Sequence, residues 1–183
     1  MIYITPILET ERLILKRGTK EDYQKVYEYD FTKLRDIAGE FEFVKQDPSR
    51  IEGFEEPYDN SYDWIIYLKE SNRPIANIVA DRERKEINSI EIAFNTHPDY
   101  WRKGYTSEAI IKILDFLFSQ GYDNIISGYD EGNIKSKSLG EKLGFTLYET
   151  KESAWVKQGI PITSYITIIS KETFKELYNN KGR

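Results

Sequence analysis

The residues between positions 101 and 107 combine the side chains and backbone that bind a phosphate group. The run reads Trp101-Arg102-Lys103-Gly104-Tyr105-Thr106-Ser107, and the longest amphipathic helical pattern in the chain follows it. Two cationic side chains supply charge, glycine lets the backbone approach an anion, and the first N–H groups of a helix have no partner within the helix. Neither a G-x-x-x-x-G-K-S/T loop nor a G-x-G-x-x-G fingerprint is present. The turn therefore indicates an anion site, with an ordinary helix start as the alternative.

Three carboxylates lie in or directly after the predicted strands on either side of this run, and a carboxylate can accept a proton. Glu91 alternates with apolar residues in a predicted strand, whereas Asp130 and Glu131 follow another strand. Each also has a structural explanation, because Glu91 can face solvent on its strand and the other two can shape a turn. The single histidine, His97, precedes Pro98, and we expect it to shape that loop rather than to act in catalysis.

Composition removes several other chemistries. The 183 residues include no Cys and one His, which excludes a thiolate nucleophile and Cys-bound zinc, and we expect no metal. A net charge of −5 argues against a nucleic-acid partner. No apolar run approaches the ~20 residues of a membrane span, and the first residues lack the pattern of an export signal. We therefore expect a cytoplasmic protein without membrane attachment, as a monomer or homodimer.

The negative charge is concentrated between Glu40 and Asp63. This segment holds eight carboxylates against two basic residues, a net charge of −6, and aromatic residues are interleaved with them. One interpretation is a solvated loop. The other is the wall of a pocket for a cationic, partly apolar ligand, because carboxylates attract positive charge and rings pack against a carbon skeleton.

Short strands and helices alternate along the chain and must position these groups. Thr19 with Asp22 predicts the start of a helix, along which Tyr23, Val26, Tyr27 and Asp30/Phe31 follow at helical spacing. The long helix that Gly121 ends has an apolar stripe of Ile110, Ile113, Leu114, Leu117 and Phe118. Gly144 ends a helix over 134–143. The remaining predicted elements are strands over 12–16, 64–68, 75–80, 90–94, 124–129, 145–149 and 162–169 and a short helix over 171–178. Mixed strands and helices in this order predict one α/β (α+β) domain over residues 1–183.

Three segments together resemble the GNAT superfamily of N-acetyltransferases. Trp101–Thr106 resembles motif A, a Q/R-x-x-G-x-G/A turn that holds the pyrophosphate of acetyl-CoA. Leu8–Leu15 resembles the opening strand of the Rim-type branch, which includes ribosomal-protein N-terminal acetyltransferases. Asn133–Ser136 followed by Glu141–Phe145 resembles motif B, whose Asn and Ser lie near the pantetheine arm. The three motifs occur in the family's order and cover roughly residues 8–170.

The resemblance implies a fold and a binding mode. A central, mostly antiparallel sheet would splay between its fourth and fifth strands, here Ile90–Asn95 and Asn124–Tyr129, to admit acetyl-CoA. The implied cofactor-binding residues are Phe94, Asn95 and Thr96 on the strand, Arg102, Lys103, Gly104, Tyr105, Thr106 and Ser107 in the turn, and Asn133 and Ser136 in motif B. The strand would contribute backbone groups to the pantetheine amides, including one N–H that faces the thioester oxygen. Acetyl transfer to a neutral amine would then be direct.

Three positions depart from the family pattern. Gly140 stands where many members carry the tyrosine that protonates the leaving thiolate, and Gly128 stands where some carry a glutamate. Thr106 occupies the G/A place of motif A. The base candidates are therefore Glu91 on the fourth strand, which we favour, or Asp130 and Glu131 just after the fifth. Ser136 is the other catalytic candidate, because motif B supplies a role for it.

The function that follows is acetyl-CoA-dependent N-acetylation of a primary amine. The acceptor would be a small molecule or a peptide N-terminus, cationic if the acidic segment forms its pocket. The alternative is a catalytically silent acyl-CoA-binding sensor or partner-binding module of the same fold, which the missing tyrosine favours. A nucleotide-binding protein is a more distant third interpretation.

Overall fold

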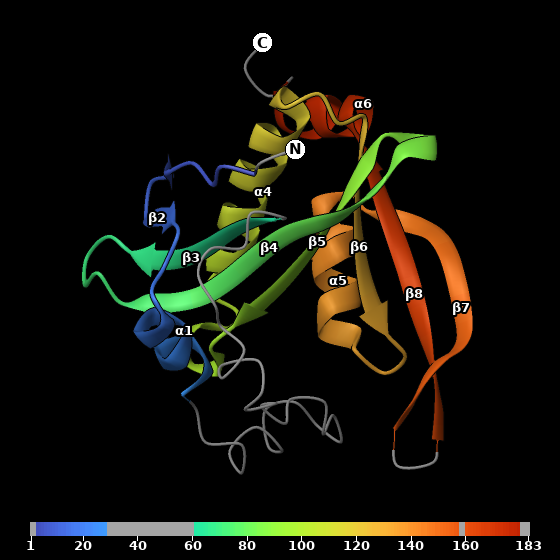
Figure 1. Ribbon diagram of the computed structural model, residues 1–183, viewed down its shortest axis with the longest axis horizontal. Coiled ribbons are helices and arrows are strands. Elements are labelled where there is room, and N and C mark those ends of the chain that lie inside the picture. Colours follow the sequence, from blue (N-terminus) through green and yellow to red (C-terminus); the bar gives the residue numbers. More distant parts are fainter. Residues whose placement is uncertain (1–2, 29–60, 158–159, 180–183) are drawn as a thin grey trace. The chain divides into compact units, whose positions relative to one another are not determined.

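The computed structural model describes residues 3–28, 61–157 and 160–179 (Figure 1). The predicted continuation of the first helix to Asp30 and Phe31 lies outside the described residues, as does most of the acidic segment. Of that segment, residues 61–63 are described, and they belong partly to a strand.

Eight strands of the described residues form one mixed sheet in the order β1-β2-β3-β4-β5-β6-β8-β7. Their bounds are β1 Leu8–Glu9, β2 Leu13–Lys16, β3 Tyr62–Leu68, β4 Pro74–Arg84, β5 Ser89–Thr96, β6 Asn124–Asp130, β7 Thr146–Lys157 and β8 Ile160–Ser170. The β5–β6 pair is parallel, whereas β1–β2, β2–β3, β3–β4, β6–β8 and β7–β8 are antiparallel. The predicted α/β class with a mostly antiparallel sheet is confirmed.

The start of α1 and both ends of α5 lie at the residues that their caps predict, and α4 ends two residues before the predicted Gly121. A capping box between Thr19 and Asp22 opens α1 (Lys20–Tyr27). The Asn133 side chain caps α5 (Ile134–Leu143), and Gly144 closes it with φ at 95°. Long helix α4 (Tyr105–Ser119) buries the predicted apolar stripe. The remaining elements are α6 Lys171–Phe174, the 3-10 turns η1 Lys85–Ile87 and η2 Pro98–Tyr100, and the π-helical turn η3 Lys175–Asn179.

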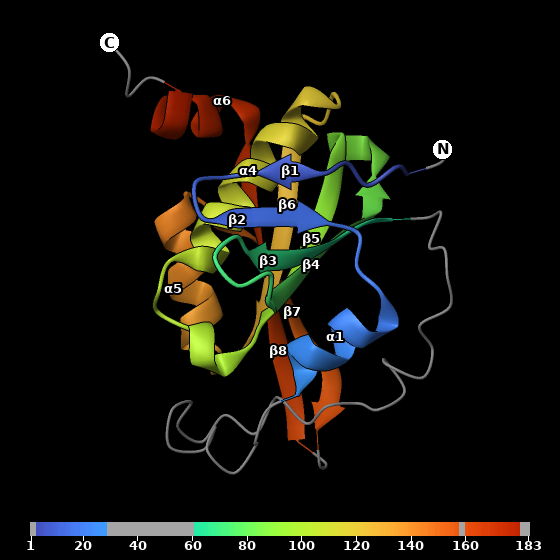
Figure 2. The same cartoon turned by 90° about the vertical axis from the view of Figure 1, so that its left-hand side faces the viewer.

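The chain divides into two compact units, of which the first comprises Met1–Asp81 and Phe94–Ile113. In this unit β1, β2 and β3 lie side by side, with α1 against the same part of the sheet (Figure 2). Val26 of α1 packs with Ile65 and Tyr67 of β3 in a buried cluster. The apolar residues of the predicted helix over Tyr23, Val26 and Tyr27 therefore face β3.

The second unit comprises Arg82–Ala93 and Leu114–Arg183. Here β6, β8 and β7 lie next to one another (Figure 1), and both late strands are longer than the sequence predicts. The β5–β6 register runs from Ser89↔Asn124 to Ile92↔Ser127. It ends there, although β5 continues to Thr96 and β6 to Asp130.

Candidate active site

The turn at Gly104 has the backbone conformation that a close anion contact requires. Gly104 has φ at 81° and Arg102 has φ at 60°, so two residues of the turn are left-handed. The first helical hydrogen bond of α4 runs from the Glu108 N–H to the Gly104 carbonyl, 3.0 Å apart. The N–H groups that precede Glu108 in α4 therefore have no acceptor within the helix. A Cβ built on Gly104 would meet Arg12 Nη2 at 3.4 Å and no other described atom within 4 Å.

The residues on either side of the turn are tied to the end of β5. Trp101 Nε1 donates to the Thr96 carbonyl at 2.7 Å, and the hydroxyls of Thr96 and Thr106 lie 2.8 Å apart. The Thr106 side chain, which departs from the family's small residue, is thus directed to β5. Lys103 Nζ lies 5.2 Å from the ring centre of Tyr100. These contacts fix both ends of the run that the sequence marks as an anion site.

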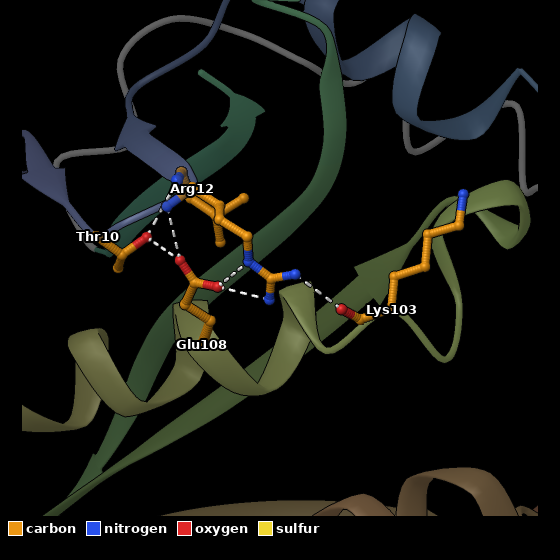
Figure 3. Close-up of polar contacts among 5 residues, drawn as sticks. Thr10, Arg12, Lys103 and Glu108 are labelled. Carbon is orange, nitrogen blue, oxygen red and sulfur yellow. Dashed lines mark hydrogen bonds and ion pairs between the residues drawn. The ribbon is translucent and has the colours of Figure 1, made fainter. Parts of the chain in front are cut away.

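A carboxylate on α4 joins the turn to the N-terminal segment (Figure 3). Glu108 Oε1 accepts hydrogen bonds from Thr10 Oγ1 at 2.5 Å and from the Arg12 N–H at 3.0 Å. Its Oε2 lies 2.7 Å from both Nε and Nη2 of Arg12. Burial by itself would raise the pKa of Glu108, but the hydrogen bonds from Thr10 and Arg12 and the Arg12 charge outweigh it and lower that pKa. The carboxylate is therefore ionised and fully engaged at neutral pH.

The candidate base on β5 is already paired. Glu91 Oε1 lies 3.6 Å from Arg82 Nη1, and the Glu91 side chain is half-buried. The ion pair engages one carboxylate oxygen of Glu91. Asp130, expected just after the strand, is instead the last residue of β6, and its carboxylate accepts from Ser164 Oγ on β8. Glu131 follows β6, and its backbone N–H donates to Thr163 O at 2.8 Å.

His97 has the loop-shaping role that the sequence predicts. The residue is buried, Nδ1 accepts from the Asp99 N–H at 3.2 Å, and Nε2 lies 3.0 Å from the Glu28 carbonyl. The His97 N–H donates to Ile75 O at 2.8 Å, which joins β4 to the loop after β5. These contacts hold the loop that leads into the Gly104 turn.

Motif B forms the start of α5. Asn133 Oδ1 accepts from the Ser136 N–H at 3.1 Å, so the asparagine side chain caps the helix. Lys137 and Glu141 form an exposed ion pair one turn further along. Gly140, at the position of the family's tyrosine, offers space, because a Cβ there would first meet Phe145 Cβ at 3.8 Å.

A polar cluster between α1 and the sheet was not predicted. Tyr23 Oη donates to Asp63 on β3, whose side chain is almost fully buried, and Tyr27 Oη donates to Asn77 Oδ1 at 3.0 Å. Burial raises the pKa of Asp63, against the opposing effects of the Tyr23 hydrogen bond and the Arg17 charge. Asp63, counted in the sequence as part of an acidic segment, is thus an interior residue. Its position directly before the apolar run at 64–68 was the available signal.

Two properties of the described residues bear on cofactors and location. No three of their His, Asp and Glu side chains gather closely enough to hold a metal ion. None of the helices within residues 3–28, 61–157 and 160–179 has the length and apolar character needed to cross a bilayer.

Sequence comparison now assigns the class of protein that this fold and turn indicate. The sequence model of the acetyltransferase (GNAT) domain matches residues 12–146, so the chain belongs to the GNAT acetyltransferase family. A relative named as the uncharacterized N-acetyltransferase YoaA of Bacillus subtilis is 27% identical over 173 residues, which cover 91% of this chain and 97% of the relative. The predicted superfamily and enzyme class are confirmed.

Solved structures share the fold at low sequence identity. An acetyltransferase (GNAT family) from Bacillus anthracis has a TM-score of 0.74 and 22% identity, covering 91% of this chain and 99% of that one. Ribosomal-protein-S5-alanine acetyltransferase from Vibrio fischeri has a TM-score of 0.69 and 16% identity, covering 93% and 99%. The acetyltransferase MccE, solved with acetyl-CoA and AMP, has a TM-score of 0.68 and 15% identity, covering 88% and 93%. A spermidine N-acetyltransferase chimera from Vibrio cholerae and hSSAT has a TM-score of 0.70 and 16% identity, covering 90% and 98%.

Proposed function

We propose that this chain moves the acetyl group of acetyl-CoA directly to a primary amine. The amine nitrogen attacks the thioester carbonyl carbon and forms the C–N bond of a tetrahedral intermediate. This intermediate collapses to the amide when the C–S bond breaks. The amine nitrogen loses a proton, and the departing thiolate takes one up. The observation that carries the proposal is the Gly104 turn, where left-handed backbone, two cationic side chains and the start of α4 coincide in a GNAT family member. The shared fold with MccE, which was solved with acetyl-CoA, supports this choice of cofactor.

The turn would hold the diphosphate of the cofactor. The N–H groups of Tyr105, Thr106 and Ser107 precede the first helical hydrogen bond and would donate to phosphate oxygens. Arg102 and Lys103 would add positive charge, and Gly104 would let the phosphate approach the backbone. Because Thr106 Oγ1 lies against Thr96 Oγ1, its contribution to the phosphate is its backbone.

The end of β5 would hold the pantetheine arm through alternate residues. The His97 N–H bonds to Ile75 O of β4, the neighbouring strand, and successive residues of a strand direct their backbone groups to alternate sides. If this alternation holds back along β5 from His97, the backbone of Asn95 would face β4, and those of Phe94 and Thr96 would face the opposite side. Of the three expected residues, Phe94 and Thr96 would then be the ones that bind the pantetheine amides. The Thr96 carbonyl keeps one lone pair for a ligand beside its bond from Trp101.

The acceptor would be a cationic amine or a peptide N-terminus flanked by basic residues. The negative charge of the acidic segment supports this class, since residues 40–62, without the buried Asp63, still carry a net charge of −5, and such a field raises the encounter rate of cations. Two proteins of the same fold fit the two possibilities, one named for spermidine and one for the alanine of ribosomal protein S5. The second name also supports the Rim-type branch, to which Leu8–Leu15 points. Glu91, half-buried beside Arg82, is the proposed base, and Ser136 is the candidate at motif B.

One observation favours a silent acyl-CoA-binding module instead. Gly140 supplies no acid for the leaving thiolate, and the space beside it holds only Phe145 within 4 Å among the described residues. Such a protein would bind CoA but release almost no thiol in the presence of amines.

The deciding experiment is a thiol-release screen with acetyl-CoA. Polyamines, aminoglycosides, amino acids and basic N-terminal peptides are compared with acidic peptides at two salt concentrations. We expect turnover with cationic acceptors, and a kcat/KM that falls as salt rises, because added salt screens the attraction. Binding of CoA without turnover of any amine would favour the silent module. Equal use of acidic and cationic acceptors would remove the acidic segment from substrate choice.

A further inference from the structure

The Gly104 turn is held from outside its own motif by the segment before β2. Glu108 receives three hydrogen bonds and an ion pair from Thr10 and Arg12, so one carboxylate joins α4 to that segment (Figure 3). The residues joined are 96 to 98 positions apart in the sequence. The side chain of Glu108 is 19% exposed and that of Arg12 is 43% exposed, so the contact is partly shielded from water.

Arg12 also contacts the turn itself, on both sides of Gly104. Its Nη1 donates to the Lys103 carbonyl at 3.1 Å, and its Cζ lies 4.5 Å from the ring centre of Tyr105. Its Nη2 borders the space beside Gly104. Because a guanidinium is a planar group with donors in fixed directions, these contacts together define one position for the turn.

This part of the backbone is one that needs support. Lys103 lies between Arg102 and Gly104, both of which have positive φ, and Arg102 pays a steric penalty that glycine does not. Strained backbone persists where its surroundings define it. The Arg12 bond to the Lys103 carbonyl acts between the two left-handed residues.

We propose that Arg12 and Glu108 are positioning residues that preorganise the diphosphate-binding turn for CoA. The proposal rests on the proposed function, since it concerns the same cofactor site. The two residues act through the backbone of the turn, and the cofactor meets N–H groups that are already arranged. A turn that is competent one tenth of the time would bind about tenfold more weakly.

Two variants separate positioning from simple charge. Glu108→Ala removes a negative charge near the turn, which on charge alone would strengthen binding of the anionic cofactor. Positioning predicts the opposite, a loss of about tenfold in CoA affinity. Arg12→Lys keeps the positive charge but cannot make the paired contacts of the guanidinium. Positioning therefore predicts that this variant also binds CoA more weakly than wild type. Glu9→Gln is the matched control, because Glu9 lies in the same segment and pairs with Lys69 instead of the turn.

The affinity of each variant for CoA is measured by titration calorimetry, with thermal melting to confirm folding. If the wild type has acetyltransferase activity, kcat and KM of each protein are also measured with two acetyl donors, acetyl-CoA and S-acetylpantetheine. The second donor lacks the diphosphate. We expect both variants to raise KM for acetyl-CoA about tenfold with kcat unchanged, and to leave kcat/KM for S-acetylpantetheine unchanged. If Glu108→Ala destabilises the fold, Thr10→Val, which removes one bond to Glu108, should give a smaller effect of the same kind.

The outcomes distinguish this proposal from the proposed function. If the wild-type protein does not bind CoA, both the proposed function and the positioning proposal are wrong. If the wild type binds CoA and Glu108→Ala binds it equally well or more tightly, only the positioning proposal is wrong. Equal losses with acetyl-CoA and S-acetylpantetheine also overturn it, because a general structural defect acts on both donors.

Discussion

Replacing Gly104 by aspartate tests the diphosphate site with a single side chain. Because Gly104 has φ at 81°, any other residue meets left-handed strain of about 1–2 kcal/mol. The new Cβ would lie 3.4 Å from Arg12 Nη2, an ordinary contact, so we expect the variant to fold. In a chain of this size each 1 kcal/mol lowers Tm by about 2–4 °C. The expected cost in stability is therefore modest.

The loss of CoA binding in Gly104→Asp should come mainly from the new negative charge and not from this backbone strain. Asparagine has nearly the same size as aspartate and tolerates positive φ, so the two variants differ mainly in charge. Two unit charges 4 Å apart repel by about 1 kcal/mol in water and about 4 kcal/mol at an effective dielectric constant of 20. Gly104→Asp should consequently bind CoA roughly 5- to 1,000-fold more weakly than Gly104→Asn.

Thermal melting with and without CoA measures this difference. At a CoA concentration of about 100 Kd the wild type gains about 2.7 kcal/mol, whereas a variant with a 100-fold higher Kd gains about 0.4 kcal/mol. Gly121→Asp is the control, since Gly121 has φ at 102° and open space around its Cβ position. It should lose stability but keep the full CoA shift. Equal CoA shifts in Gly104→Asp and Gly104→Asn would refute the assignment of the turn.

Four further perturbations give expected outcomes. Neutralising Arg102 and Lys103 together should weaken CoA binding in calorimetry more at low salt than at high salt, because salt screens exposed charges; no salt dependence would remove them from the site. Glu91→Gln should lower kcat at pH 7 with CoA affinity unchanged, and the deficit should narrow as pH rises and free amine increases; equal kcat values at pH 7 would exclude Glu91 as the base. The lowered pKa of Glu108 stabilises the fold above its unfolded pKa, and this stability is lost as pH falls through the folded pKa. Urea unfolding should therefore show that Glu108→Gln costs most at neutral pH and less in acid. The raised pKa of Asp63 has the opposite sign, so Asp63→Asn should compare more favourably with wild type at pH 7 than in acid, and a reversed order would contradict the burial argument.

Elements with local signals were predicted closely. The helix over 134–143 has the predicted bounds because Asn133 caps its start and Gly144 adopts the positive φ that ends it. The Thr19 cap and the strand around Glu91 were predicted for similarly local reasons, a capping pattern and a period of two. The Gly104 turn was recognisable because its residue types lie together in sequence.

Long-range partners left no such signal. Nothing in the sequence near Arg12 indicates Glu108, because their contact depends on how β2 and α4 are arranged in the fold. Asp63 was grouped with its acidic neighbours, although its pairing opposite Val79 and its contact with Tyr23 make it an interior residue. β7 extends to Lys157 through an irregular stretch between Lys151 and Trp155, which breaks the alternation that predicts a strand.

Arg12 leaves the ribosome long before Glu108 does. The two residues are 96 positions apart, an interval of about 5–20 s at synthesis rates of about 5–20 residues per second. A contact between residues distant in sequence also costs loop-closure entropy, and this cost arises before the contact stabilises the fold. The N-terminal segment can meet β3 of the growing chain first, through the Leu13↔Leu68 register. We therefore expect the turn to reach its final form late during synthesis, so that the newly made protein becomes competent to bind CoA only after the sheet around β2 and β3 has assembled.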